Sequence, residues 1–277
     1  MNSFVSLAGK VAVITGGAGV LGLALGKGLA RCGVKIAILG RSVKGIEAAK
    51  VEIETLGGSA MALVADVLDE GSLRQSAQQV LEQWGHIDVL INCAGGNLPG
   101  ATISPEQTIF DLSVADFDEV MTLNSKGSLL PILVFGAAMK EARGGSIINI
   151  SSMSAQQPLT RVFGYSASKA AVDNMTRWLA VEMAKKFGGS IRVNAIAPGF
   201  FVGAQNRRLL LQDDGQLTAR GQTIIDHTPM GRFGEPEELC GVVNWLCSDE
   251  ASFVTGVIIP IDGGFSAFQE YKNGTSC

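Results

Sequence analysis

The sequence predicts an α/β fold, in which a single domain carries a seven-stranded parallel sheet with helices on both faces. Short apolar runs of strand length alternate with longer segments whose apolar residues recur at helical spacing. Consecutive parallel strands need crossover helices, and these cover the two faces of the sheet. The chain has 277 residues and no linker-like stretch, so we expect one domain over residues 1–277.

Each expected strand is short, largely uncharged and mostly apolar, with many β-branched residues. In the segments between the strands, apolar residues recur at the helical period of about 3.6 residues. Leu21, Leu25 and Leu29 recur at helical spacing after the first strand, and the segment 72–84 carries Leu73 and Val80 on one side. We expect strands at 10–15, 34–39, 60–65, 87–92, 146–150, 191–195 and 257–261.

The turn after the first expected strand is rich in glycine. Gly17, Gly19 and Gly22 have the spacing G-x-G-x-x-G, and Gly16 precedes them. Glycines let the backbone turn tightly and approach a pyrophosphate, which the free amides at the start of the next helix hold. A lone motif of this kind is about equally compatible with a tight turn. The strand before it and the helix after it favour a dinucleotide site.

Tyr165 and Lys169 follow a serine pair, Ser151 and Ser152, at the end of the fifth expected strand. Residues four apart lie on one face of a helix, so the Lys169 ammonium would favour the ionised phenol of Tyr165. A tyrosine whose ordinary pKa is about 10 would then act as an acid or base nearer neutrality. The same spacing also arises by chance on exposed helices, so the pair gains its meaning from the glycine motif.

Composition disfavours several other classes of protein. A formal charge of −4 argues against a nucleic-acid surface. The longest apolar stretch, between Lys126 and Lys140, spans thirteen residues and contains Pro131, which is too short to cross a bilayer. The first ten residues lack the features of a secretion signal, so we expect a cytoplasmic protein. Five cysteines and two histidines form no ligand cluster, so no metal site is expected.

In order and spacing, the motifs resemble the short-chain dehydrogenase/reductase family almost from end to end. Two departures are visible: Val20 stands where the family usually has glycine or alanine, and Cys93 replaces an asparagine. We therefore expect an altered loop path with binding intact. The matching pieces are Thr15-Gly16 with the glycine loop, Asp66, Asn92-Cys93-Ala94-Gly95, Asn124, Ser152, Tyr165 with Lys169, and Pro198-Gly199.

The resemblance implies a Rossmann fold and an NAD(P)-dependent oxidoreductase that interconverts an alcohol and a carbonyl compound. Tyr165 would be the general acid/base, and Lys169 would hold the nicotinamide ribose and lower the tyrosine pKa. Ser152 would hydrogen-bond the reacting oxygen, and Asn124 would support a water in a proton relay. The resemblance places the cofactor against Gly16, Gly17, Gly19, Leu21, Gly22, Arg41, Asp66, Val67, Asn92, Ala94, Gly95, Tyr165, Lys169, Pro198 and Gly199.

The end of the second strand bears on the choice of nicotinamide cofactor. An acidic residue there is typical of NAD, whereas a 2′-phosphate requires its absence and a nearby cation. The residues are Gly40, Arg41 and Ser42, which favour NADP(H) over NAD(H). Stacking of Arg41 on the adenine would suit either cofactor. Asp66 is expected to meet the adenine or, alternatively, to cap the turn before Leu68.

A long polar segment at about 200–229 is typical of a substrate lid. The candidate substrate residues are Arg161, Asn206 and Arg207, because a planar guanidinium matches a carboxylate. The common alternative is that these arginines are ordinary surface residues without a ligand. The stretches 94–102 and 198–207 resemble the bacterial sugar-acid branch of the family, especially the D-mannonate oxidoreductase (fructuronate reductase) group. That implies a keto sugar acid as substrate. A 3-oxoacyl thioester reductase and a dinucleotide-binding sensor without turnover are the alternatives.

Two expected helices carry more apolar surface than one sheet face can cover. They are the segment 170–186, with Trp178 beside its apolar side, and the largely uncharged segment 127–139. Members of the resembled family commonly pair such helices, so we expect a homotetramer.

Overall fold

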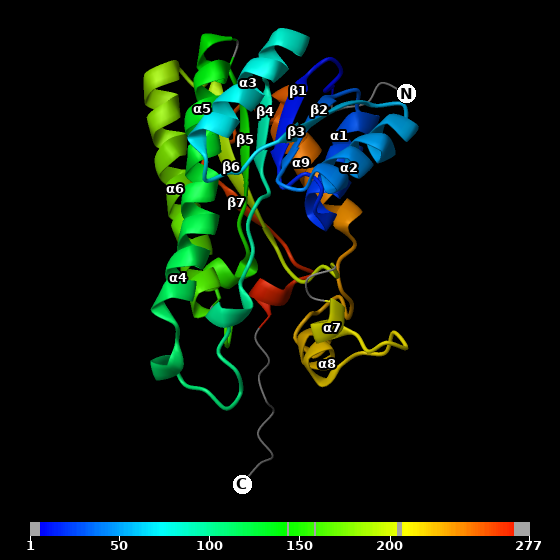
Figure 1. Cartoon of the computed structure of the whole chain (residues 1–277), viewed down its shortest axis with the longest axis vertical. Coiled ribbons are helices and arrows are strands. Elements are labelled where there is room, and N and C mark those ends of the chain that lie inside the picture. Colours follow the sequence, from blue (N-terminus) through cyan, green and yellow to red (C-terminus); the bar gives the residue numbers. More distant parts are fainter. Residues whose placement is uncertain (1–5, 143, 158, 204–206, 269–277) are drawn as a thin grey trace.

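The computed structural model describes residues 6–142, 144–157, 159–203 and 207–268. Its centre is one parallel sheet in the order β3-β2-β1-β4-β5-β6-β7, flanked by helices, which confirms the predicted fold (Figure 1). Every expected strand is present, with ends that move by three residues at most. The strands are β1 (Val11–Thr15), β2 (Lys35–Gly40), β3 (Ser59–Val64), β4 (Val89–Asn92), β5 (Gly145–Ile150), β6 (Ile191–Pro198) and β7 (Ile258–Ile261).

The strand order places a crevice beside β1. The chain leaves β1 toward β2 on one side and later returns to pair β4 on the other, so the loops that follow β1 and β4 separate at this point. Ligands of open α/β sheets bind there. The helices of the described residues are α1 (Val20–Arg31), α2 (Val43–Thr55), α3 (Glu70–Trp84), α4 (Val114–Met121), α5 (Gly127–Glu141), α6 (Phe163–Phe187), α7 (Arg207–Leu210), α8 (Ala219–Asp226) and α9 (Cys240–Cys247).

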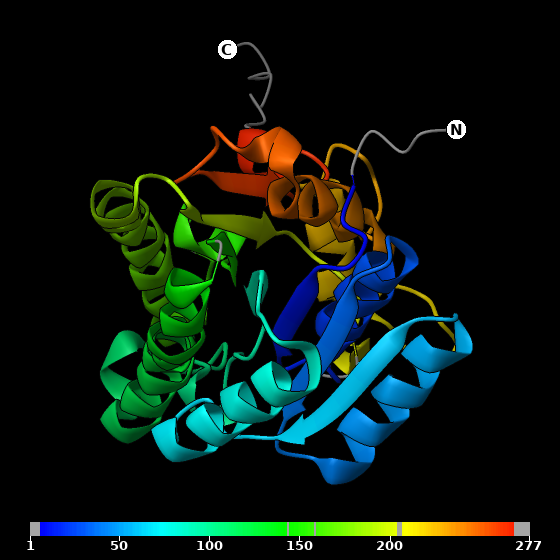
Figure 2. The same ribbon diagram turned by 90° about the horizontal axis from the view of Figure 1, so that it is seen from above.

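The sheet separates two hydrophobic clusters. In β1, Ala12 and Ile14 face the cluster beneath α1, α2 and α9, whereas Val11 and Val13 face the cluster beneath α3, α5 and α6. This is the alternation of side chains expected along a strand, here with both faces apolar because both are covered. Figure 2 shows the two groups of helices on either side of the twisted sheet. Fully burying one such aliphatic side chain contributes about 1.5–3 kcal/mol.

One continuous helical run joins α4 to α5 through a π-helical turn at Thr122–Lys126. The run Val114–Glu141 is 28 residues long, with a mean hydropathy of 1.2 in its most apolar window. Length and composition alone would allow such a helix to cross a membrane. Half of that window is buried inside the molecule, however, and the core helix of a soluble protein passes the same test. The sequence prediction counted only the stretch after Lys126, because the acidic residues of α4 conceal the continuation.

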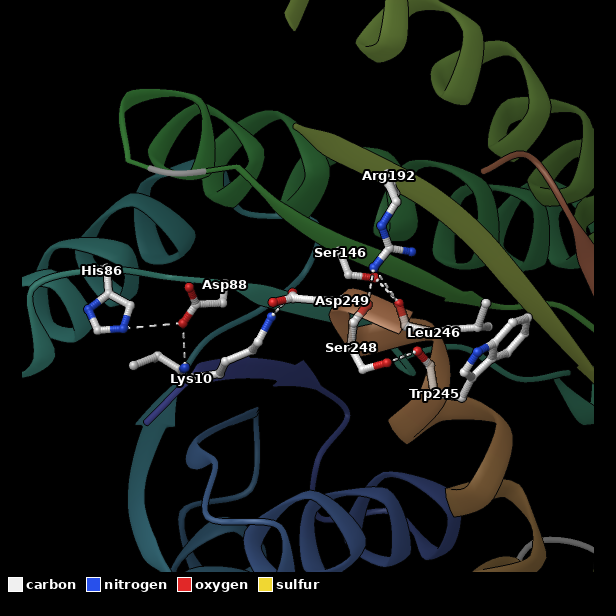
Figure 3. A network of polar contacts seen from close by, with 10 residues as sticks. Lys10, His86, Asp88, Ser146, Arg192, Trp245, Leu246, Ser248 and Asp249 are labelled. Atoms are coloured by element: carbon white, nitrogen blue, oxygen red, sulfur yellow. Dashed lines mark hydrogen bonds and ion pairs between the residues drawn. The ribbon is translucent and has the colours of Figure 1, made fainter. Parts of the chain in front are cut away.

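The amino ends of the strands, at the far end of the sheet from the glycine loop, are tied to α9 by a polar network (Figure 3). Ser146 in β5 donates its hydroxyl to the carbonyl of Leu246 at 2.8 Å. Arg192 in β6 donates Nη2 to the carbonyls of Leu246 at 2.8 Å and Ser248 at 3.0 Å. These bonds satisfy carbonyls at the end of α9 and hold the base of the sheet.

Candidate active site

A cleft of about 400 Å³ lies at the carboxyl edge of the sheet, where the loops after β1, β4, β5 and β6 meet. It brings together most of the segments that the sequence singled out. Among the predicted site residues, its walls contain Gly16, Gly19, Leu21, Gly22, Gly95, Ser152, Tyr165, Lys169, Pro198 and Gly199.

The glycine loop forms one wall of the cleft, and its close contacts explain the glycines. A Cβ added to Gly22 would lie 2.5 Å from the carbonyl oxygen of Gly16, and Gly16 itself has a left-handed φ of +62°. Helix α1 starts at Val20 with no side chain capping its first amides and no acidic residue in its first turn. Those amides have no intrahelical partner. The wall therefore fits an anion such as a pyrophosphate, as the spacing predicted.

The loop after β4 forms the opposite wall. The hydroxyl of Thr15 accepts from the amides of Cys93 and Ala94, both at 3.2 Å, which joins this loop to the end of β1. A Cβ added to Gly95 would lie 2.6 Å from Asn124 Oδ1 and 3.4 Å from Lys169 Nζ. Only glycine fits at position 95, because a side chain there would collide with Asn124.

Tyr165 and Ser152 meet inside the cleft. Tyr165 lies in the first turn of α6, and its phenol is hydrogen-bonded to Ser152 at the end of β5. The Ser152 oxygen also accepts from the amide of Ser154 at 3.2 Å and from its hydroxyl at 3.0 Å, which fixes the serine rotamer. The two hydroxyls can therefore address one ligand oxygen together.

The prediction that the pKa of Tyr165 falls is wrong. Burial raises the pKa of the phenol above its ordinary value, and the hydrogen bond from Ser152 opposes this only in part. The Lys169 ammonium is 5.6 Å from the centre of the tyrosine ring and donates to the carbonyl of Ile150 at 2.8 Å. It is therefore directed toward β5 rather than paired with the phenol oxygen.

Lys169 is itself strongly perturbed. It is only 5% exposed, and burial lowers its pKa to about 8, while the neighbouring Cys93 and Asp173 act in the opposite direction. Asp173 is one helical turn further along α6 and is hydrogen-bonded to the hydroxyl of Ser151. Sequence analysis missed Asp173, although its position four residues after Lys169 was a usable signal.

Asn124 is fully buried in the π-helical turn between α4 and α5. Its side chain accepts from the amide of Gly96 at 3.1 Å and donates to the carbonyls of Gly96 at 2.8 Å and Val120 at 2.9 Å. The side chain thus braces the wall after β4. A π-turn at this place is consistent with a functional site, where such turns often occur.

Three predicted cofactor residues make structural contacts instead of lining the cleft. Asp66 accepts from the amide of Leu68 at 2.9 Å, which is the turn-capping alternative. Asn92 is buried and donates Nδ2 to Asn149 Oδ1 at 2.9 Å, so its side chain holds β4 to β5. Val67 packs beneath Gly127, whose added Cβ would lie 3.0 Å away. Arg41 is exposed at the end of β2, and Gly17 and Ala94 lie within the two walls.

Cys93 is partly buried against the cleft, and burial raises the pKa of its thiol to about 11, an effect that the neighbouring Lys169 reduces. It is therefore a neutral thiol near pH 7. The described cysteines, Cys32, Cys93, Cys240 and Cys247, form no disulfide.

The predicted lid contains two short helices, α7 and α8, which pack on each other below the carboxyl edge of the sheet at the lower right of Figure 1. Arg207 begins α7 and is exposed. Asn206 lies outside the described residues. Arg161, just before α6, is half-buried, and its charge acts on that of Arg220 in α8. Sequence analysis missed Arg220, because no local pattern shows that α8 folds back toward the start of α6.

Comparison with known proteins finds oxidoreductases that are similar over nearly the whole chain. A family model described as "Enoyl-(Acyl carrier protein) reductase" matches residues 17–266. The uncharacterized oxidoreductase UxuB of Bacillus subtilis (strain 168) is 47% identical, over 95% of this chain and 97% of that protein. The 2-dehydro-3-deoxy-D-gluconate 5-dehydrogenase of Escherichia coli (strain K12) is 36% identical, over 95% and 97%.

One solved structure is similar to this chain over nearly its whole length. The crystal structure of a candidate D-mannonate oxidoreductase from Haemophilus influenza, with bound NAD, is 43% identical to this chain and superposes with a TM-score of 0.89. The match covers 96% of this chain and 98% of that one.

Proposed function

Since this chain belongs to the short-chain dehydrogenase/reductase family of NAD(P)-dependent oxidoreductases, we propose that it interconverts a keto sugar acid and the corresponding secondary alcohol. The pair that we favour is of the D-fructuronate and D-mannonate type. Sugar-acid dehydrogenases among its relatives support that class of substrate.

The chemistry follows from the residues in the cleft. The bound nicotinamide supplies or accepts the hydride. In the reductive direction, Tyr165 donates its phenolic proton to the carbonyl oxygen as carbon receives the hydride, so a ketone becomes an alcohol. Ser152 donates a hydrogen bond to the same oxygen. Lys169 contributes its positive charge near the developing tyrosinate and holds the ribose, and Asn124 keeps the wall after β4 in place.

The observation that carries this proposal is the meeting of Tyr165 and Ser152 in a cleft whose other wall is the glycine loop. A proton donor and a dinucleotide site must share one cavity for hydride and proton to reach the same carbonyl group. The segment 200–229 would cover the substrate in this cleft.

For the cofactor, we propose NADP(H) in preference to NAD(H). Gly40 carries no acid that would repel a 2′-phosphate, and Arg41 next to it is exposed and basic. The hydroxyl of Ser42 accepts from the amide of Gly45 at 3.2 Å and can still donate its proton to a phosphate. The related Haemophilus structure contains NAD, so the choice needs a direct measurement. Initial rates with both reduced cofactors decide it, and faster reduction with NADH would refute the proposal.

The substrate proposal is tested with the wild-type enzyme and a matched panel of carbonyl compounds. We expect the highest kcat/KM with D-fructuronate or another keto sugar acid, and a much lower value with a 3-oxoacyl thioester. The reverse order would favour a 3-oxoacyl thioester reductase, the activity that the name of one relative gives.

A further inference from the structure

Arg161 and Arg220 lie close enough for their charges to interact, and their surroundings suggest a shared ligand. Arg161 lies four residues before Tyr165, in the loop that leads into α6. Arg220 lies in the first turn of α8 in the lid. Both side chains are half-buried.

Arg161 is held in an unusual conformation. Its φ of +75° is the only left-handed value among the described residues other than glycine. A non-glycine residue in this region costs about 1–3 kcal/mol, and such residues are concentrated at functional sites. Two bonds to Ile103 stabilise it: the Ile103 amide donates to the Arg161 carbonyl at 2.9 Å, and Arg161 Nε donates to the Ile103 carbonyl at 2.8 Å. Within the described ranges, no hydrogen bond from the two terminal amino groups of this guanidinium is found, so both can donate to a ligand.

The loop that carries Arg161 and the lid are connected through the residues after β7. Gln157 in this loop donates to the carbonyl of Ser266 at 2.6 Å. The neighbouring Phe265 packs against His227, directly after α8, with ring centres 6.4 Å apart, and against Phe200 at 5.4 Å. The start of α6, the residues after β7 and α8 therefore form one packed unit.

The charges of this pair are uncompensated by the described part of the chain. Neither arginine has a carboxylate within 4.0 Å among those residues. Burial lowers the pKa of Arg220, and the repulsion from Arg161 lowers it further. Two cations that lie near each other repel, and an anion between them would replace this repulsion by attraction.

We propose that Arg161 and Arg220 form a clamp that binds the carboxylate of the substrate between the start of α6 and the lid. The clamp depends on the proposed function, since it requires a substrate that carries an acid group. In a keto sugar acid of the D-fructuronate type, hydroxyl-bearing carbons separate the carboxylate from the ketone. One end of the substrate would then lie at Tyr165 and Ser152 while the other contacts the clamp, and the guanidinium planes suit its two oxygens.

The test removes the charge of Arg220 and keeps its length. We expect Arg220→Gln to raise KM for the keto sugar acid about 10- to 100-fold, the range for lost charge-assisted hydrogen bonds. KM for the nicotinamide cofactor and kcat/KM for an uncharged ketose should stay unchanged. KM for the keto sugar acid in Arg220→Lys should lie between the values for the wild type and Arg220→Gln, because lysine keeps the charge but lacks the planar guanidinium. Arg208→Gln, in the exposed part of the lid, is the matched control and should behave like the wild type.

A binding measurement completes the test. In the presence of oxidised cofactor and a Tyr165→Phe background, calorimetric titration with D-mannonate should show weaker binding for Arg220→Gln but not for Arg208→Gln. Equal KM and equal affinity in a folded Arg220→Gln variant would overturn the clamp and leave the sugar-acid function standing. If the wild type turns over a 3-oxoacyl thioester but no sugar acid, the proposed function fails, and the clamp fails with it.

Discussion

Lys169 illustrates how much the chemistry of this site depends on single residues. Tyr165 precedes it by one turn of α6, Asp173 follows it by one turn, and Cys93 reaches it from the end of β4. The Ile150 carbonyl of β5 accepts from its ammonium. With a pKa of about 8, the amine is charged below that pH and becomes neutral above it.

We predict that kcat/KM falls as the pH rises through about 8, because the neutral amine no longer supports tyrosinate or ribose. Asp173 raises the pKa of Lys169, so Asp173→Asn should lower that pKa and move the alkaline limb to lower pH. Ser151→Ala removes the hydrogen bond to Asp173 while keeping its charge, and should leave the limb in place. A limb that stays fixed in Asp173→Asn, or moves to higher pH, would contradict this role for Asp173.

The residues of the site differ in how well the sequence predicts them. Tyr165, Lys169 and Ser152 have fixed spacings at a strand end and in a helix, so topology alone brings them together. The side-chain directions of Asn92 and Asp66 depend on partners, Asn149 and the Leu68 amide, that local pattern does not specify. The pKa of Tyr165 was predicted in the wrong direction because burial outweighs the hydrogen bond from Ser152, and a helical spacing does not show burial.

At the scale of elements, strands are predicted better than the lid. The inner strands β1, β2, β4, β5 and β6 are buried, largely apolar runs, and burial on both faces favours one interpretation of such a run. The edge strands β3 and β7 are only partly buried. Helices α7 and α8 are short and mostly polar, and a tertiary contact, the close approach of Gly221 to the Leu210 carbonyl, fixes their packing. Helix propensity alone does not predict such short elements.

The contact between β6 and α9 gives a prediction at this scale. Arg192 is 8% exposed and donates to the carbonyls of Leu246 and Ser248 (Figure 3). It also donates to the carbonyl of Val254 at 3.3 Å. Arg192→Met removes all the hydrogen bonds that the charged guanidinium donates to these carbonyls, and should lower the free energy of unfolding by about 2–3 kcal/mol. Urea unfolding measures it.

Arg74→Met is the control for that experiment. Arg74 forms an exposed ion pair with Glu70 at the surface of α3, with side chains 68% and 53% exposed. Its loss should change the free energy of unfolding by less than about 1 kcal/mol. Equal effects of the two substitutions would show that the buried arginine has no special role in stability.

At the scale of the whole molecule, α5 and α6 leave an apolar surface uncovered. They lie side by side at the left of Figures 1 and 2. Leu133 in α5 is 57% exposed, and Trp178 and Val181 in α6 are 63% and 55% exposed. The inner sides of both helices pack in the core, as Phe135 and Leu179 show. An exposed apolar face of this kind fits the tetramer expected from the sequence.

We predict a tetramer for the wild type in solution and a smaller species for Trp178→Glu, because burying an unpaired carboxylate in an interface is unfavourable. Light scattering at micromolar concentration measures the mass. Phe253→Glu, a fully exposed aromatic outside these helices, is the control and should remain a tetramer. A monomeric wild type would contradict the prediction.

The central claim is that the Tyr165 phenol exchanges the proton while a nicotinamide in the same cleft exchanges the hydride. Tyr165→Phe removes that proton and preserves the shape of the side chain. We predict a kcat about 10²- to 10⁴-fold lower, with unchanged affinity for the nicotinamide cofactor by fluorescence titration. Turnover near the wild-type rate in this variant, with cofactor bound as before, would contradict the claim.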